Sequence, residues 1–122
     1  MDLIMPQVFD RIKAASGELV RCKRFPLGVW NMDANDYRLV AWSMPDLSKI
    51  LSVEVLIISD DGNQLAPLCG TTDYGTGKTN GGIGAIHTNN LSVYRTVGGI
   101  FDNTAYDDAV MNRGYIFVWY IE

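Results

Sequence analysis

The sequence predicts an all-β protein, an antiparallel β-sandwich of about six to eight strands with a short N-terminal helix. Apolar and polar side chains alternate in short runs from Gly17 to the end of the chain, and turn residues, mainly Gly, Asp and Asn, separate these runs. A length of 122 residues, 48% of them hydrophobic, is enough for a single core. No internal repeat and no Pro- or Ser-rich linker divides the chain, so we expect one core.

The N-terminal helix is predicted over residues 6–15. Apolar side chains recur there at helical spacing, and a Ser-Gly pair follows as a stop signal. We therefore divide the chain into an N-terminal helix or attachment segment, residues 1–17, and a β-sandwich domain, residues 18–122.

The strands are predicted from period-2 alternation. The clearest is 50–59, where one face is lined by Leu51, Val53, Val55 and Ile57. The Asp-Asp-Gly-Asn sequence that follows predicts a hairpin turn, because these residues tolerate a positive φ. The predicted strands are residues 18–25, 28–32, 37–43, 50–59, 64–68, 91–97 and 114–121.

The final predicted strand is apolar on both faces. Tyr115, Phe117 and Trp119 alternate with Ile116 and Val118. A two-layer sandwich covers only one face of each strand, so the other face needs a second cover. We expect that cover to be another subunit; the alternative is the N-terminal helix or a long loop of the same chain.

Two long loops interrupt the strand pattern: a Gly-, Thr- and Asn-rich loop at 70–84 and an acidic, aromatic loop at 100–113. The first contains Gly-Thr-Gly-Lys-Thr at 75–79, which is similar to the end of a phosphate-binding loop. Thr72 stands where that motif needs a glycine, and the Asn- and Gly-rich sequence that follows is poor helix material. A flexible surface loop is therefore the preferred interpretation.

The charge balance disfavours nucleic acid as a partner. The chain has 14 acidic and 10 basic residues, a net charge of −4, whereas phosphate binding needs a concentrated basic face. Half of the bases lie in the first 25 residues, which form either a solvated face or a surface for an acidic partner. Membrane insertion is not expected, because the apolar runs are far shorter than about 20 residues.

Histidine and cysteine usage argues against a structural zinc site of the usual kind. The chain has one histidine, and Cys22 and Cys69 lack the paired spacing of a zinc site. The N-terminus has no basic start followed by a long apolar stretch, so we expect no secretory signal, folding in the reducing cytoplasm and two thiols rather than a disulfide. No cofactor is expected; for the carboxylates at 102–108, calcium stays open as an alternative.

His87 is the candidate general base. With Cys69 or a serine as nucleophile and an aspartate to orient it, His87 supports an alternative function as a small hydrolase or carbohydrate-processing subunit. The sequence has no Gly-x-Ser-x-Gly nucleophile elbow, so we expect a protein that is not an enzyme.

Ligand-binding residues are predicted in the two long loops instead. Sugar rings pack on aromatic side chains, while Asp and Asn side chains bind hydroxyl groups. Each loop carries a tyrosine beside an aspartate. The candidate ligand-binding residues are Asp73, Tyr74, Asp102, Asn103, Tyr106 and Asp107.

Six stretches of the chain carry a resemblance to a known group of proteins. They are Leu-Gly-Val-Trp-Asn-Met-Asp at 27–33, Ser-Asp-Asp-Gly at 59–62, Tyr-Arg-Thr at 94–96, Gly-Gly-Ile-Phe-Asp-Asn at 98–103, Tyr-Asp-Asp at 106–108 and Asn-Arg-Gly-Tyr-Ile-Phe-Val-Trp-Tyr at 112–120. Together they resemble distal β-sandwich domains of tail-fibre and related structural proteins from phages and prophages of gut bacteria. More distantly, the strand order is similar to that of H-type lectins, which are trimeric sandwiches that bind sugars between protomers.

The resemblance implies a non-enzymatic structural or adhesion module, either a tail-fibre tip or a virion accessory protein. It also implies a homotrimer that is associated with the virion. The expected partners are a cell-surface glycan or another virion protein, contacted through the 70–84 and 100–113 loops.

Overall fold

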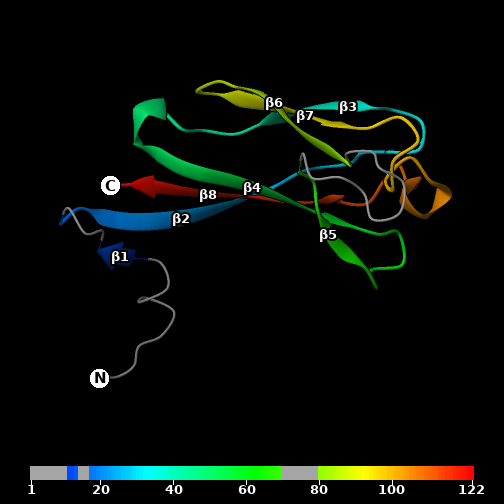
Figure 1. Ribbon diagram of the computed structural model, residues 1–122, viewed down its shortest axis with the longest axis horizontal. Coiled ribbons are helices and arrows are strands. Elements are labelled where there is room, and N and C mark those ends of the chain that lie inside the picture. The colour runs from blue at the N-terminus through cyan, green and yellow to red at the C-terminus, as the bar shows by residue number, and fades with distance from the viewer. Residues whose placement is uncertain (1–10, 14–16, 70–79) are drawn as a thin grey trace.

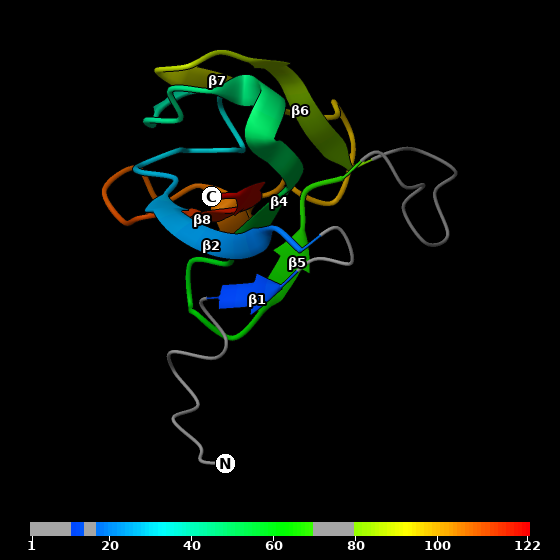
Figure 2. The same ribbon diagram turned by 90° about the vertical axis from the view of Figure 1, so that its left-hand side faces the viewer.

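The computed structural model describes residues 11–13, 17–69 and 80–122 and places them in two antiparallel sheets (Figure 1, Figure 2). The larger sheet has the strand order β1-β2-β8-β4-β5, and the smaller one has the order β3-β7-β6. The predicted all-β sandwich is therefore confirmed. The strands are β1 (Arg11–Lys13), β2 (Leu19–Pro26), β3 (Tyr37–Ala41), β4 (Ile50–Ile58), β5 (Leu65–Pro67), β6 (Gly81–Ile86), β7 (Asn90–Arg95) and β8 (Gly114–Ile121).

The helices among the described residues are two single 3-10 turns, η1 (Leu47–Lys49) and η2 (Thr104–Tyr106). Each begins after a residue whose side-chain oxygen accepts a backbone N–H of the turn, Asp46 for η1 and Asn103 for η2. Within this part of the chain, no helix has the length and apolar character needed to cross a membrane.

The core lies between the two sheets, and β8 runs through the middle of the larger one (Figure 1). The inward side chains of β8, Ile116 and Val118, are fully buried. Burial of one such side chain stabilises the fold by about 1.5–3 kcal/mol. They belong to one buried cluster with Val55 and Ile57 of β4 and Leu91 and Val93 of β7.

The outward face of β8 is apolar as well, and it is half-buried. In the sheet, Trp119 lies between Cys22 of β2 and Ser52 of β4. The guanidinium of Arg24 lies 4.4 Å from the centre of the Tyr115 ring. Neighbouring strands of the same sheet therefore cover this face in part.

The predicted helix over residues 6–15 is wrong at Arg11–Lys13, which form β1. This strand pairs antiparallel with β2, with Ile12 opposite Val20. Without it, β2 presents an edge of unpaired backbone groups, and a short helix is marginal by itself, so pairing along the edge is the better arrangement. The other residues of the predicted helix lie outside the described part of the chain.

The predicted strand over residues 28–32 is also wrong. The segment forms a single bridge, between Val29 and Asn112, because Gly28 has a φ of +87° that turns the chain out of the extended conformation. The alternation that suggested a strand is nevertheless real, since Trp30 and Met32 are buried and Val29 is exposed. The segment is a loop with one face packed on the core.

Two smaller differences from the predicted strands concern the start of β6 and a shift of register in β4. Residues 81–84, predicted as loop, begin β6. Gly81 lies so close to β7 that a Cβ there would collide with the carbonyl oxygen of Tyr94, so glycine permits this pairing. Leu51, predicted on the same strand face as Val55 and Ile57, is exposed because the register shifts between Ile50 and Ser52.

The predicted hairpin turn at 60–63 is confirmed and joins β4 to β5. The Ser59 backbone N–H donates to the carbonyl oxygen of Gln64 over 3.0 Å. The Asp61 carboxylate accepts hydrogen bonds from the Ser59 hydroxyl (2.7 Å) and from the backbone N–H of Asn63 (2.9 Å). These bonds fix the turn and leave Asp60, at its start, facing the 100–113 loop.

Candidate functional site

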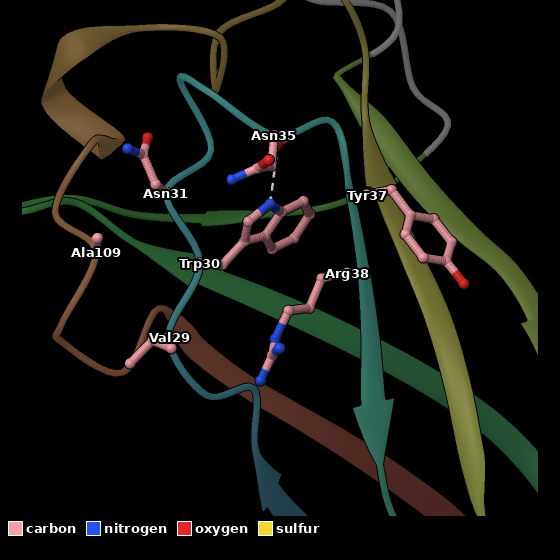
Figure 3. A pocket seen from close by; sticks show the side chains of 7 residues that line it. All are labelled: Val29, Trp30, Asn31, Asn35, Tyr37, Arg38 and Ala109. Atoms are coloured by element: carbon pink, nitrogen blue, oxygen red, sulfur yellow. Dashed lines mark hydrogen bonds between the residues drawn. The ribbon is translucent and has the colours of Figure 1, made fainter.

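A hollow of about 250 Å³ opens between the loop that follows Gly28 and the start of β3 (Figure 3). We call it the Trp30 hollow. The 100–113 loop contributes one residue to its wall. The lining residues are Val29, Trp30, Asn31, Asn35, Tyr37, Arg38 and Ala109.

Two buried arginines fix the loop that forms this hollow. The Arg95 Nε donates to the carbonyl oxygen of Met32 over 2.6 Å, and the Arg113 Nε donates to the carbonyl oxygen of Trp30 over 2.9 Å. Arg95 is 7% exposed and Arg113 is fully buried. Charged donors from the end of β7 and from the residue that precedes β8 therefore hold the loop backbone in place before any ligand binds.

Trp30 forms the back of the hollow rather than a stacking surface. Its side chain is buried, and its indole Nε1 donates to the backbone carbonyl of Asn35 over 2.9 Å (dashed line in Figure 3). The Asn31 side-chain oxygen accepts the backbone N–H groups of Asp33 (3.1 Å) and Ala34 (3.0 Å). Asn31 and Asn35 thus line the hollow from a loop whose own backbone is already bonded.

Arg38 supplies the charge of the hollow. It is the second residue of β3 and lies on the inward face of that strand, the face that also carries Val40. Figure 3 shows its side chain pointing to the side of β3 that carries Trp30, whereas Tyr37 points the other way. A Cβ on Gly28 would lie 2.6 Å from an Arg38 terminal nitrogen, so glycine there lets the guanidinium lie against the loop backbone.

The Trp30 hollow is a site of hydrogen-bond donors. Its seven lining residues include one base and no acid. Asp108, the neighbour of Ala109, has its carboxylate occupied by the backbone N–H groups of Val110 (2.8 Å) and Met111 (3.1 Å). Such an arrangement binds and orients acceptor groups, and it contains no nucleophile or general base.

A second hollow of about 180 Å³ lies beside β2 and η1. It contains Lys23 and Lys49 but also Asp46, whose carboxylate accepts from both the backbone and the hydroxyl of Ser48. The Lys23 ammonium lies 5.5 Å from the centre of the Tyr120 ring. The Asp46 carboxylate and the Lys23 ammonium of this hollow thus already have partners, which makes it the weaker candidate.

Tyr106, a predicted ligand-binding residue, is part of the core. It is 3% exposed, its ring packs edge-on against Phe101 with 5.1 Å between centres, and its hydroxyl donates to the Gln64 side chain over 3.1 Å. Burial raises the pKa of this phenol above its ordinary value. A ring in this position cannot stack on a sugar, so Tyr106 is corrected from a ligand-binding to a structural residue.

The other predicted residues of the 100–113 loop shape the loop itself. Asp102 accepts the backbone N–H of Gly98 over 2.8 Å and lies 3.5 Å from Arg95. Asn103 accepts the backbone N–H of Ala105 over 2.9 Å at the start of η2. Asp107 remains exposed, and its backbone N–H donates to Asp60 over 3.2 Å. The structure does not bring Asp102, Asn103 and Asp107 together into the Trp30 hollow.

Two of the predicted site residues, Asp73 and Tyr74, lie outside the described residues, as does the Gly-Thr-Gly-Lys-Thr sequence at 75–79. In the described ranges, no group of three or more His, Cys, Asp or Glu side chains is arranged to hold a metal ion, which includes the carboxylates at 102–108. Cys22 and Cys69 are not joined in a disulfide, as predicted.

His87 is exposed at the turn between β6 and β7. Its backbone is well bonded: its N–H donates to Asn90 over 2.8 Å, and its carbonyl accepts the indole N–H of Trp42 over 2.6 Å. Among the described residues, no carboxylate forms a hydrogen bond or ion pair with its imidazole. The arrangement that the hydrolase alternative needs, a base oriented by an acid, is not assembled in this part of the chain.

Arg38 and Asn35 were not predicted from the sequence as site residues. The available signal was the alternation in 37–43, which places an arginine on the same strand face as Val40 and Trp42. A charged side chain on an inward face needs a partner or an opening to solvent. That signal points to the Trp30 hollow.

Comparisons with known proteins assign no relative. The chain matches no protein-family model, no curated protein and no solved structure. The functional argument therefore depends on the residues and their geometry.

Proposed function

We propose that the chain is a non-enzymatic binding module of the phage structural or adhesion type, and that the Trp30 hollow is the place where it contacts a cell-surface glycan. The observation that carries this proposal is a set of side-chain donors that line one hollow, from Asn31 and Asn35 on a loop anchored by two buried arginines and from Arg38 on β3. Preorganised donors lose little conformational freedom on binding, which favours affinity.

The size of the hollow supports a small ligand unit. At about 250 Å³ it is below the range of about 300–1,000 Å³ that is typical of pockets for drug-sized molecules. One sugar ring at the end of a glycan is of suitable size. Its hydroxyl groups accept hydrogen bonds from the asparagine amides, while the buried Trp30 closes the back of the hollow.

The test is binding to glycans and to host cells, with an asparagine variant and a matched control. Asn35→Ala removes an exposed side-chain amide from the hollow and leaves the backbone carbonyl that Trp30 uses. Asn89→Ala makes the same change in the turn between β6 and β7, at the other end of the small sheet. We expect N35A to weaken binding and N89A to leave it unchanged. Equal binding by both variants would refute the assignment of the hollow.

The proposal includes assembly as a homotrimer. Tyr115, Phe117 and Trp119 form a continuous half-buried apolar face on β8, and Leu56 and Ile58 extend it on β4. A second copy of the chain that packs on this face buries it from solvent. A virion-associated module of this kind displays several copies of the Trp30 hollow, and multivalent display strengthens a weak contact to each glycan.

A further inference from the structure

We propose that the Trp30 hollow selects a sugar that carries a carboxylate, and that Arg38 is the residue that binds this carboxylate. The inference rests on the proposed function, because it names the chemical class of the ligand at that same site.

The first argument is that Arg38 lacks a partner, unlike the other arginines whose side chains are described. Arg21 pairs with Glu122 (2.9 Å), Arg95 with Asp102 (3.5 Å) and Arg113 with Asp60 (2.9 Å). Arg24 packs on the Tyr115 ring. Across the described residues, the Nε of Arg38 is the one buried side-chain nitrogen or oxygen atom without a hydrogen-bond partner.

A partly buried guanidinium without a partner is costly, because it has given up water without gaining an acceptor. Proteins usually satisfy such a group, as this chain does for Arg95 and Arg113. Arg38 also lines the hollow, so a ligand that enters there can supply acceptors to the part of the guanidinium that faces it.

The second argument is charge complementarity. The chain carries a net charge of −4, yet the lining of the hollow has a formal charge of +1 from Arg38 and contains no acid. A positive site attracts an anionic ligand, and the lining residues carry no negative charge that would repel it. Neutral sugars gain nothing from this charge.

The third argument concerns the shape of the group that binds. A guanidinium is a planar fork of donors that matches a carboxylate in a bidentate arrangement. Figure 3 shows the Arg38 guanidinium on one side of the Trp30 indole and the two asparagines on the other. A uronic acid places a carboxylate at one side of its ring and hydroxyl groups around the rest, so both sets of donors are used together.

The test is a pair of NMR titrations of the wild-type chain, with sodium glucuronate and with glucose, at equal ionic strength. The reporters are the Trp30 indole N–H and the side-chain amides of Asn31 and Asn35. We expect saturable shifts at these groups, with glucuronate bound at least about tenfold more tightly than glucose, the factor expected for one charge-assisted contact.

The variant Arg38→Gln should remove this preference and bind both sugars at the affinity of glucose. Arg21→Gln is the matched control, because it removes the same charge from a surface pair remote from the hollow. It should keep the preference. If R38Q fails to fold, the comparison of the two sugars with the wild-type chain still decides whether the hollow prefers a carboxylate.

The outcomes separate the two proposals. Equal affinity for glucuronate and glucose in the wild type, or a preference that survives in R38Q, overturns the carboxylate inference and leaves the glycan site standing. Absence of shifts at the hollow with either sugar overturns the proposed function itself, and the inference with it.

Discussion

The guanidinium of Arg113 lies 2.9 Å from the Asp60 carboxylate, and the arginine side chain is fully buried while that of Asp60 is 25% exposed. The same guanidinium donates to the carbonyl oxygens of Trp30 (2.9 Å), Ile58 (3.0 Å) and Asp108 (2.8 Å). One side chain thus joins the loop of the candidate site, the end of β4 and the 100–113 loop. The position of the Trp30 hollow depends on this contact.

Replacement of Arg113 by Gln should therefore destabilise the fold strongly. The change removes the charge that pairs with Asp60 and leaves three carbonyl oxygens short of a donor. Breaking a buried pair of this kind costs about 3–5 kcal/mol. Denaturant unfolding of R113Q measures the loss.

Arg21→Gln is the control for that measurement. Its pair with Glu122 has the same 2.9 Å separation, but the two side chains are 35% and 40% exposed. Exposed pairs contribute about 0–1 kcal/mol. If R113Q and R21Q lose similar free energies of unfolding, burial does not determine the strength of the Arg113 contact.

The stability should fall in acid, and Asp60 should contribute to the fall. Burial by itself raises the pKa of Asp60, but the hydrogen bonds from Arg113 and from the backbone of Asp108 outweigh it and leave this pKa below the ordinary 3.8. The unfolded state then binds the proton more readily than the folded state. The contribution of Asp60 to stability is therefore complete above pH 3.8 and is lost as the pH falls through the lower pKa of the folded state.

Asp107 should show the opposite sign. Its hydrogen bond with Asp60, followed by burial, raises its pKa above 3.8. Asp107 therefore contributes to stability below pH 3.8, and this contribution is lost as the pH rises through its raised pKa. Urea unfolding should show that D60N loses more unfolding free energy, relative to wild type, at about pH 7 than at about pH 3. D107N should be at least as stable as wild type there, and parallel pH profiles for the two variants would contradict this assignment.

Gly114 at the start of β8 should not tolerate a side chain. Its φ is +157°, and a Cβ would collide with the backbone carbonyl oxygen of Leu56 in β4. Since backbone atoms of a central strand cannot move aside, Gly114→Ala should lose more than about 2 kcal/mol of unfolding free energy.

The matched variant is Gly62→Ala in the β4–β5 hairpin. Gly62 also has a positive φ, +75°, but nothing lies within 4 Å of its would-be Cβ. Only the cost of the left-handed conformation applies, about 1 kcal/mol. Thermal and urea unfolding of both variants separates the collision from the backbone strain, and equal losses would show that the close approach to Leu56 relaxes easily.

The parts of the fold that could be predicted are those where alternation and turn chemistry agree. The limits of β8 and the hairpin at 60–63 follow from apolar periodicity and from residues that accept the turn conformation. Arg11–Lys13 could not be predicted, because pairing with the open edge of β2 is a tertiary contact that outweighs the local helical spacing.

The candidate site was less predictable than the fold. Tyr106 lies in a polar loop and has the composition of a sugar-binding residue, but the loop folds back and buries its ring against Phe101. Conversely, the alternation in 37–43 places Arg38 on an inward strand face, but its lack of a partner becomes visible only when the ion pairs of the other arginines are known. Loop packing and side-chain pairing across the sheets are long-range properties that local pattern does not encode.

The solution mass tests the proposed assembly. Light scattering on a size-exclusion column should give about three times the 13.5 kDa of one chain. Trp119→Lys places a charge in the centre of the outward face of β8 and should yield monomers that remain folded by circular dichroism. Leu39→Lys makes a similar change on β3, where the side chain is 51% exposed on the other sheet, and should remain trimeric.

A wild-type chain that runs as a monomer would refute the trimer. The neighbours that flank Trp119 in the sheet, Cys22 and Ser52, together with the cation of Arg24 over Tyr115, would then be sufficient cover for this face. Each glycan would in that case be bound by a single copy of the Trp30 hollow. Adsorption to cells should then have only the affinity of one site, because a monomer makes no multivalent contribution.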